Sequence, residues 1–365
     1  MYIYQESERP NFDWNMEKIL EILSRVKFAQ GLLLGKMKAI GFNHKEEAIL
    51  NVLTQDVLKS SEIEGEILDK EQVRSSIARR LGLDVGGNIH VDRNVEGIVE
   101  MMLDATQHYT DSLTKERLIG WQASLFPTGY SGMYEINVGR FRDDKNGPMQ
   151  VVSGPIEKRK VHFQAPDASS LESEMAHFLS WINTTTELDG ILKAGIAHLW
   201  FVTLHPFDDG NGRIARAITD MLLARAENST QRFYSMSTQI RKERNNYYNI
   251  LEKTQKGFLD ITDWLVWYLE CLLRAIENTE DILASIFIKA SFWQRYSNIT
   301  LNDRQKKVIN RLLESFEGKL TSSKWAKLCK CSQDSANRDI ADLIGKKIFI
   351  KLGAGRSTNY ILNME

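Results

Sequence analysis

Apolar residues recur every three or four positions along most of the chain, which is the spacing of one buried helix face. Between residues 14 and 37 one such stripe holds Ile19, Ile22, Leu23, Val26 and Leu33. The same spacing predicts helices over residues 46–64, 69–81, 94–109, 115–126, 171–182, 191–204, 213–226, 242–256 and 261–277, with a connecting helix to about residue 296. Gly65 is expected to end the second helix, and Asp69 to cap the third.

The helical pattern is interrupted between Gly129 and Pro166, where glycine and proline gather around short β-prone segments. Residues 149–152 and 161–163 are the most β-prone of these, and they predict a hairpin or flap. A second glycine-rich stretch, residues 82–88, is expected to be a loop. Everything else before residue 296 is predicted to be helical or to connect helices.

The last 69 residues follow a different plan, with short elements in quick succession. Three helices are expected over residues 303–315, 322–329 and 332–345, followed by strands at 348–352 and 359–362. Three helices and a two-stranded ribbon are typical of a winged-helix domain. We therefore expect a mainly α fold with an N-terminal helical region (1–92), a central helical domain with a β-hairpin flap (93–296) and a small winged-helix domain (297–365).

Composition supports this reading and changes it in one respect. Six prolines in 365 residues is well below the usual frequency of roughly 5% and favours long helices. The 47 Lys+Arg and 48 Asp+Glu give a net charge of −1, which is not typical of a strongly basic nucleic-acid binder. Residues 297–365, however, hold 13 Lys+Arg and 7 Asp+Glu, a net of +6, so the preceding residues carry −7. Neutrality overall conceals an acidic body and a basic tail.

Membrane and secreted classes are not expected. The start MYIYQESERP has no basic and apolar leader pattern, and charged residues interrupt the apolar stretch at 261–276. Three cysteines, Cys271, Cys329 and Cys331, form neither an even disulfide set nor a zinc-binding spacing. We expect a cytoplasmic protein with reduced cysteines.

The chemistry is concentrated in the string His205-Pro-Phe-Asp-Asp-Gly-Asn-Gly-Arg-Ile-Ala-Arg216, between two predicted helices. Glycines at 210 and 212 allow several backbone N–H groups to point at one anion at a helix N-terminus. Arg213 and Arg216 add cationic forks for outer phosphates, and Asp209 suits a Mg²⁺ (or Mn²⁺) ion that bridges phosphate oxygens. His205 remains as a base.

This string resembles the Fic-family signature HxFx(D/E)GNGRxxR at every specified position. Most members transfer AMP from ATP to a protein hydroxyl and release pyrophosphate. The resemblance implies that His205 deprotonates a Ser, Thr or Tyr of a target protein, or of the chain itself, and that Asp209 holds the metal. It assigns the phosphates to Gly210, Asn211, Gly212, Arg213 and Arg216.

The resemblance extends to three other segments. Residues 149–154 resemble the family flap, which pins the target by strand addition and whose turn, Ser153 and Gly154, would lie near the nucleotide. Tyr247 or Tyr248 together with Gln255 would face the adenine. Residues 60–65, SSEIEG, fit the inhibitory pattern (S/T)xxxE(G/N) on an inhibitory helix at about 45–65. Glu64, on one helix face with Ser60, would pair with Arg216 in the space that the γ-phosphate needs.

The sequence leaves alternatives open. With Glu64 engaged, some self-inhibited relatives remove AMP, and the same site could transfer another phosphate-containing group. A third hypothesis is a DNA-binding regulator whose body only senses nucleotide, with Gln333, Asn337 and Arg338 on a recognition helix and residues 353–356 as the wing. A homodimer is compatible with the resemblance. No motif identifies the target protein.

Overall fold

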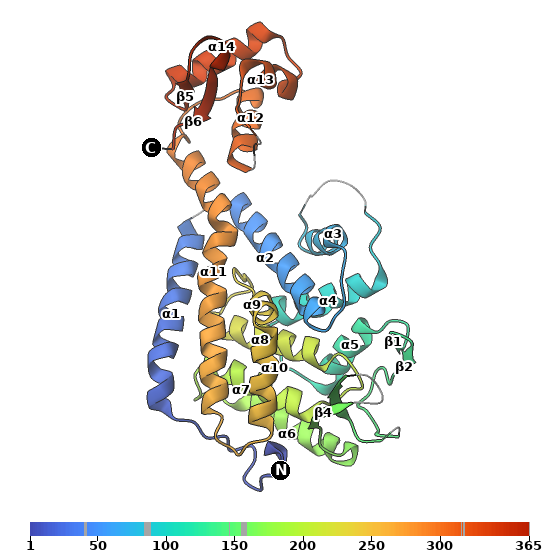
Figure 1. The fold of residues 1–365 in the computed structure, drawn as a ribbon. Helices are drawn as coiled ribbons and strands as arrows, with labels where there is room; N and C mark the ends of the chain where they lie inside the picture. The colour runs from blue at the N-terminus through green and yellow to red at the C-terminus, as the bar shows by residue number, and fades with distance from the viewer. Residues whose placement is uncertain are drawn as a thin grey trace. The chain divides into compact units, whose positions relative to one another are not determined.

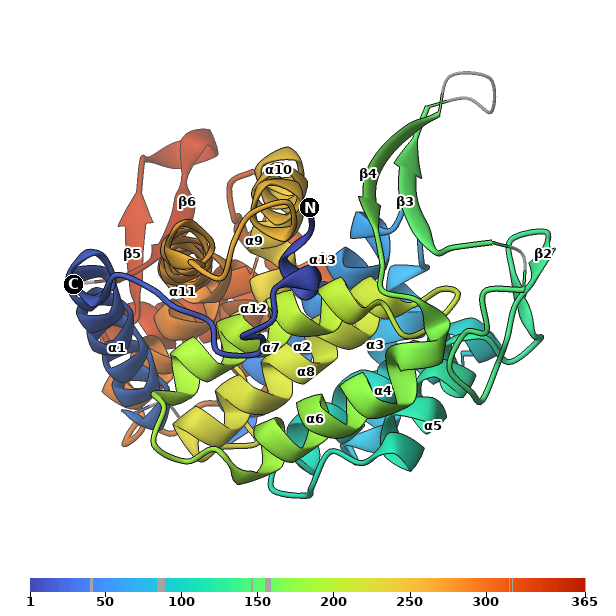
Figure 2. The same ribbon diagram turned by 90° about the horizontal axis from the view of Figure 1, so that it is seen from below.

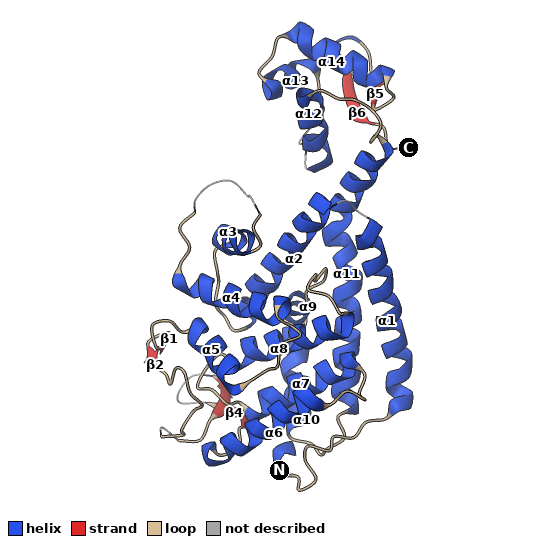
Figure 3. Ribbon diagram, turned by 180° about the vertical axis from the view of Figure 1, so that it is seen from behind, coloured by secondary structure: helices blue, strands red, loops and turns tan. Residues whose placement is uncertain are grey.

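The computed structural model describes residues 1–39, 42–83, 89–145, 147–154, 159–314, 316 and 318–364. It separates into two compact units, the first made of Met1–Gly35 and Ala48–Thr279 and the second of Lys36–Glu47 and Glu280–Glu365. Helices dominate the described chain (Figure 3), so the expected mainly α fold is confirmed. The division into regions 1–92, 93–296 and 297–365 stays a prediction.

Figure 1 follows the elements along the chain, beginning with a short 3₁₀ turn at Ile3–Gln5. The helices up to the candidate motif are α1 (Met16–Ala39), α2 (Phe42–Ile63), α3 (Lys70–Arg80), α4 (Arg93–Gln107), α5 (Lys115–Leu125), α6 (Leu171–Thr184) and α7 (Gly190–Leu204). They are followed by α8 (Asn211–Glu227), α9 (Met236–Lys242), α10 (Arg244–Gln255) and α11 (Thr262–Arg295).

Two helices differ from expectation. Helix α9 was not predicted, because its seven residues are too few to show a helical period, although Ser235 caps it by accepting from the Thr238 N–H. Helix α11 is continuous over 34 residues, where the sequence suggested a helix and a separate connector. The predicted caps near α2 and α3 are present: Gly65 has φ +89°, and the Asp69 carboxylate accepts from Gln72 N at 2.9 Å.

In the part of the chain that the structure describes, strands form three antiparallel pairs. Strands β1 (Tyr130–Ser131) and β2 (Tyr134–Glu135) make a small hairpin within the glycine-rich region. Strands β3 (Gln150–Ser153) and β4 (Lys160–Gln164) make the predicted flap, which Figure 2 shows projecting from the helices. Its register pairs Gln150 with Gln164 and Ser153 with Lys160, with an irregularity after Val151. Within the described residues, no helix is long and apolar enough to cross a membrane.

Helices α7 and α8 pack against each other at the centre of the first unit, and the candidate motif connects them. Every residue of α7 from Ile191 to Leu204 is buried, which fits a helix that is apolar on all sides. Trp200 meets Phe178 edge-on, with ring centroids 5.4 Å apart. This packing fixes the end of α7, and therefore the start of the motif.

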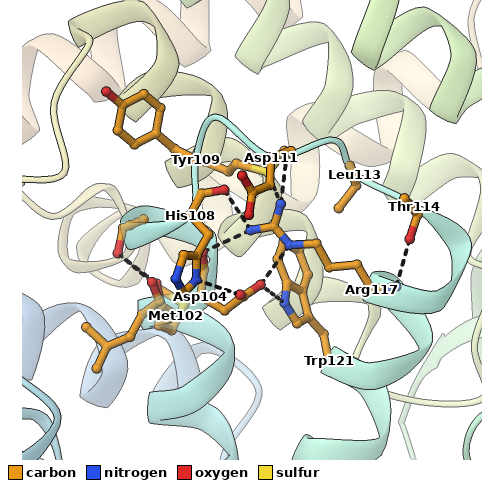
Figure 4. Close-up of polar contacts among 12 residues, drawn as sticks. Met102, Asp104, His108, Tyr109, Asp111, Leu113, Thr114, Arg117 and Trp121 are labelled. Carbon is orange, nitrogen blue, oxygen red and sulfur yellow. Dashed lines mark hydrogen bonds and ion pairs between the residues drawn. The ribbon is translucent and has the colours of Figure 1, made fainter.

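A polar cluster around Arg117 fixes the turn between α4 and α5 (Figure 4). The Arg117 guanidinium donates to the backbone oxygens of Asp104, His108 and Asp111, and its Nε donates to the Asp104 carboxylate at 2.7 Å. Trp121 Nε1 donates to the same carboxylate at 2.7 Å. The last carbonyls of a helix have no N–H partner within the helix. At the end of α4, the Arg117 guanidinium supplies hydrogen-bond donors in place of those missing N–H groups.

The second unit has its own core. Helices α12 (Asp303–Glu314), α13 (Ser322–Cys329) and α14 (Gln333–Gly345) precede strands β5 (Phe349–Leu352) and β6 (Asn359–Leu362). Trp325 is fully buried and meets Phe349 edge-on at 5.9 Å. Asp339 accepts two hydrogen bonds from Arg304, at 2.7 and 3.0 Å, which joins α12 to α14. The element order is the one predicted for residues 297–365.

Candidate functional site

His205 ends helix α7 in an unusual backbone conformation. Its φ of +50° and ψ of +56° lie in the left-handed region, which few residues other than glycine adopt. The His205 N–H donates to Phe201 O at 3.0 Å, and Arg142 Nε donates to the His205 carbonyl at 2.8 Å. A residue whose backbone is held in such a conformation by its neighbours is typical of functional positions.

The proton on the His205 ring is placed by one contact. Ring nitrogen Nδ1 lies 3.2 Å from the Val202 carbonyl, which only accepts hydrogen bonds, so Nδ1 carries the hydrogen. Nε2 is then the basic nitrogen. Burial lowers the pKa of His205 below its ordinary value, while nearby Glu64 and Asp209 act in the opposite direction. The ring is therefore neutral, and able to accept a proton, at neutral pH.

Asn211 holds the loop between the two helices in shape. It is 2% exposed, its Oδ1 accepts from Phe207 N at 3.0 Å, and its Nδ2 donates to Phe207 O at 2.7 Å. Gly210, the residue before α8, has φ +89°, and a Cβ there would lie about 3 Å from the Phe126 ring. Asn211 is thus a structural clamp in this chain, and its buried side chain has both polar atoms satisfied.

Asp209 lines a cavity next to the loop, and both of its carboxylate oxygens accept hydrogen bonds. One oxygen accepts from the Gly210 N–H at 2.6 Å, and the other accepts from the Ser131 hydroxyl of the β1–β2 hairpin. Adjacent Asp208 instead accepts from Asn137 N at 2.8 Å, which fastens the preceding loop. No group of three or more metal-binding side chains occurs among the residues that the structure describes. A single carboxylate suits Mg²⁺ when phosphate and water supply the other ligands.

Arg216 is the most heavily contacted residue of the motif. It is 2% exposed and receives three contacts from the end of α2: Ser60 Oγ at 2.9 Å from Nε, and Ser60 O and Glu64 Oε1 each at 2.8 Å from Nη2. Ser60 is fully buried, whereas the Glu64 side chain is 30% exposed. The carboxylate raises the pKa of Arg216 against the effect of burial, so the pair is ionic.

The Glu64 carboxylate also lies against the N-terminus of α8. A Cβ added to Gly212 would stand 2.2 Å from Glu64 Oε1 and 3.0 Å from its Cδ, so only glycine admits the carboxylate here. Free backbone N–H groups and the helix dipole favour negative charge at such a position. An anion, supplied by the chain itself, therefore occupies the place where the sequence predicted phosphate.

Arg213 is paired in a similar way. Its Nη1 lies 2.7 Å from Glu66 Oε2, and its guanidinium stacks over the Phe126 ring at 5.0 Å. Nε of Arg213 and Nη1 of Arg216 are buried and find no hydrogen-bond acceptor in the part of the chain that is described. Buried guanidinium donors without acceptors are suited to additional oxygens, such as those of a phosphate.

Glu64 stands between two cavities, lining both. The first, about 610 Å³, is bordered by Asp209, Arg213 and the β1–β2 hairpin. The second, about 640 Å³, is bordered by His205, Gly212, the flap and helix α10. Both volumes are in the range of small-molecule sites. His205 thus lines one of these cavities and Asp209 the other, and Glu64 lines both.

Helix α10 supplies the aromatic wall of the larger cavity. Tyr247 is buried, and its hydroxyl lies 2.8 Å from Nε2 of His198, a histidine whose pKa burial lowers to about 3. Gln255 lines the same cavity, and its Nε2 donates to Thr203 Oγ1 at 3.3 Å. Tyr248 is stacked by Arg244 at 5.0 Å. The structure thus gathers both tyrosines and Gln255 around one cavity.

Sequence reasoning missed several residues of the site. Glu66 follows the inhibitory pattern, and nothing in its position alone distinguishes it from a surface residue. Arg244 Nε donates to Ile63 O at 2.8 Å and so fixes the end of α2. His162 and Glu252 form a chain of contacts with Ser153, at the end of β3, that joins the flap to α10. Each of these contacts joins positions at least 90 residues apart, except the one within the flap, so local spacing gives no signal.

Comparisons with known proteins match separate parts of the chain. Residues 112–223 match the model of the Fic/DOC family, and residues 2–83 match a domain of unknown function, DUF4172. Protein adenylyltransferases Fic of Aedes aegypti and Drosophila yakuba are 26% and 25% identical over 228 residues. The match covers 61% of this chain and 41% of the length of those relatives.

Solved structures show the same fold. A Fic family protein from Desulfovibrio desulfuricans aligns over 95% of this chain and 96% of its own, with a TM-score of 0.58 and 19% identity. A Fic domain containing signaling protein from Bacteroides thetaiotaomicron aligns over 72% of this chain and 96% of its own, with a TM-score of 0.50 and 19% identity. At these identities the likeness concerns the fold alone.

Proposed function

We propose that this chain is an ATP-dependent protein adenylyltransferase that is inhibited by its own Glu64. The observation that carries the proposal is the Glu64 carboxylate, which Arg216 binds and which lies against Gly212 in the first turn of α8, because it puts an anion in the cavity that His205 lines. The match of residues 112–223 to the Fic/DOC family, and the similarity to proteins named adenylyltransferases, support the same activity.

The reaction would transfer AMP from ATP to a Ser, Thr or Tyr hydroxyl of a target protein. His205 Nε2 takes the hydroxyl proton as the new bond to the α-phosphorus forms, and the bond from that phosphorus to the pyrophosphate oxygen breaks. The Gly210 and Gly212 amides, Arg213 and Arg216 hold the phosphates and the charge that develops on them. Asp209 would hold a Mg²⁺ or Mn²⁺ ion, which supplies charge neutralisation between phosphates.

Inhibition follows from competition for one position. While Glu64 lies on Arg216 and Gly212, a terminal phosphate has no place there, and ATP is kept from a pose suited to in-line attack. Ser60 holds Arg216 toward α2, and Glu66 withholds Arg213 in the same way. The inhibitory helix is therefore anchored on both arginines of the motif.

The test is the mass of the protein after incubation with ATP and Mg²⁺. We expect the Glu64→Gly protein to gain adducts of about 329 Da, the mass of an AMP group, and the Glu64→Gly/His205→Ala protein to modify no target protein of a cell extract. Chelation of the metal should abolish the adducts. If Glu64→Gly neither gains an adduct nor releases pyrophosphate with cell extract as a source of targets, the proposal is wrong. Removal of AMP from a modified target by wild type would instead favour the reverse reaction.

DNA contact by residues 297–365 is a second candidate function for the basic tail. Gln333, Asn337 and Arg338 are exposed on α14, which follows α12 and α13 and precedes the antiparallel pair β5–β6. The net charge of +6 over these residues favours a polyanion. Full-length protein should retard duplex DNA at low salt and release it as salt rises. Unchanged binding in Arg338→Ala/Asn337→Ala would rule out this helix as the reader.

A further inference from the structure

A hydroxyl, an imidazole and a carboxylate stand in line beside the proposed nucleotide cavity. Ser153 Oγ, at the end of β3, lies 2.6 Å from His162 Nε2 on β4. His162 Nδ1 lies 2.6 Å from Glu252 Oε2 on α10, and Lys256 donates to the other Glu252 oxygen at 2.6 Å. A nucleophile next to a base, with the base oriented by a third group, is the arrangement that activates serine in enzymes.

The direction of the hydrogen bonds follows from the charge on Glu252. Hydrogen bonds from Lys256 first, and then from His162, lower the pKa of Glu252 to about 2, so the carboxylate is ionised and only accepts. In the neutral imidazole, Nδ1 of His162 therefore carries the ring hydrogen, and Nε2 presents its lone pair. The Ser153 hydroxyl must then donate to Nε2, which is the polarity that a base needs in order to remove a proton.

The three side chains line the same cavity of about 640 Å³ as His205 and Gly212. Ser153 itself is exposed, so its oxygen is not covered by neighbouring side chains. This places an activated hydroxyl of the chain in the space where the proposed function puts ATP. The hydroxyl of another exposed serine, Ser169, instead donates to a carboxylate, Asp167 Oδ1.

We propose that Ser153 is a self-modification site, at which the chain accepts AMP on its own flap with His162 as the base. The inference rests on the proposed function, since ATP is the AMP donor. The Ser153 Oγ bond to the α-phosphorus forms, the bond from that phosphorus to the bridging oxygen breaks, and pyrophosphate leaves. The hydroxyl proton passes to His162 Nε2, and ionised Glu252 stabilises the imidazolium.

The sequence offers a clean measurement. Trypsin cleavage after Lys145 and Lys158 releases residues 146–158, NGPMQVVSGPIEK, in which Ser153 is the only residue with a hydroxyl side chain. After incubation of the full-length Glu64→Gly protein with ATP and Mg²⁺, we expect this peptide to carry an adduct of about 329 Da. Ser153→Ala should remove it.

Variants separate the relay from the flap itself. In the Glu64→Gly background, His162→Asn should lower the rate of Ser153 labelling by about 100-fold or more, the usual contribution of a general base. Labelling of other peptides should persist. Gln164→Ala is the matched control: it removes the cross-strand hydrogen bond from Gln150, two residues from His162, without touching the relay. It should label Ser153 normally, and thermal unfolding should show all variants folded.

The outcomes keep this inference apart from the proposed function. Adducts on other peptides with none on residues 146–158 would overturn the Ser153 site and leave the transferase intact. Equal labelling of Ser153 in the His162→Asn protein would overturn the role of the relay. Absence of every adduct and of pyrophosphate release would overturn both proposals together.

Discussion

The two arginines of α8 meet two carboxylates from the end of α2, yet the two contacts differ in depth. Glu64 bonds an arginine whose side chain is 2% exposed and which Ser60 also holds through two further hydrogen bonds. Glu66 forms an ion pair with Arg213, whose side chain is 8% exposed, and the Glu66 side chain is 36% exposed. An ion pair with a solvent-accessible carboxylate contributes about 0–1 kcal/mol, and at Arg216 the two hydrogen bonds to Ser60 add to it. Glu64 should therefore carry most of the inhibition.

Replacing Glu64 should produce the largest change. If the closed contact is favourable by about 3 kcal/mol, roughly 1% of molecules are open, and Glu64→Gly should raise AMP transfer about 100-fold. The rate of labelled AMP incorporation measures this. Glu62→Gly is the matched control, because it places glycine in the same turn and removes only contacts to Lys59 and Arg241. Comparable activation by Glu62→Gly would show that a loosened helix, rather than the carboxylate, is responsible.

Ser60→Ala should have an intermediate effect. It removes the hydrogen bond from Arg216 Nε to the hydroxyl while the bond to the Ser60 carbonyl remains. One such bond to a charged group is worth about 1–2 kcal/mol, so transfer should rise about 5–30-fold. Ser61→Ala, at a buried neighbouring serine, is the control and should change transfer little. A decrease with Ser60→Ala would mean that Ser60 orients Arg216 for ATP.

Glu66→Gln should give a small effect in the same direction, about 2–5-fold, since an ion pair with a solvent-accessible carboxylate contributes no more than about 1 kcal/mol. Raising the salt concentration should reproduce part of it in the wild type, because a partly exposed pair is screened. Combining Glu66→Gln with Glu64→Gly tests whether the two contacts act separately. If Glu66→Gln matches Glu64→Gly, the difference in depth between the two pairs has no consequence.

The smallest expected effect is a shift in the acidic limb of the pH–rate profile, which should differ between the Glu64 and Glu66 variants. Burial holds the pKa of His205 below its ordinary value, so activity should fall with acid only below about pH 6.5. The Glu64 charge raises that pKa, so in Glu64→Gly the limb should move to lower pH relative to the wild type. Glu66→Gln should leave it in place. Movement to higher pH in Glu64→Gly would contradict this electrostatic assignment.

The sequence predicted the fold well because the helices are regular and their apolar stripes are long. Helices α5, α7 and α13 begin and end within two residues of expectation, since Thr114, Asp189 and Thr321 cap them locally. Where no long stripe exists, as in α9, the prediction failed. The continuity of α11 was also missed, because its apolar pattern changes along its length while the backbone does not.

The site was predictable only in part. The string from His205 to Arg216 predicts an anion site, because the residues that form the site are neighbours in the chain. Glu64 and Arg216 are 152 positions apart in the chain. Their pairing was predicted from the resemblance to a family pattern and not from physical reasoning. Neither local spacing nor a family pattern predicted the contacts of Glu66 or of the Ser153–His162–Glu252 relay. Such contacts depend on how α2, the flap and α10 pack around α8, which local periodicity does not encode.

The missing side chain of Gly212 has a consequence for how such an enzyme would respond to its surroundings. Glu64 is tethered, so its effective concentration at α8 is constant, while that of a nucleotide phosphate varies with supply. For the proposed transferase, the fraction of open molecules would be set by a ratio of the two, which makes the chain a threshold detector for nucleotide. A methyl group at residue 212 would obstruct the tethered carboxylate and a nucleotide phosphate alike. In the proposed transferase, the space left by this glycine is what allows the two anions to compete.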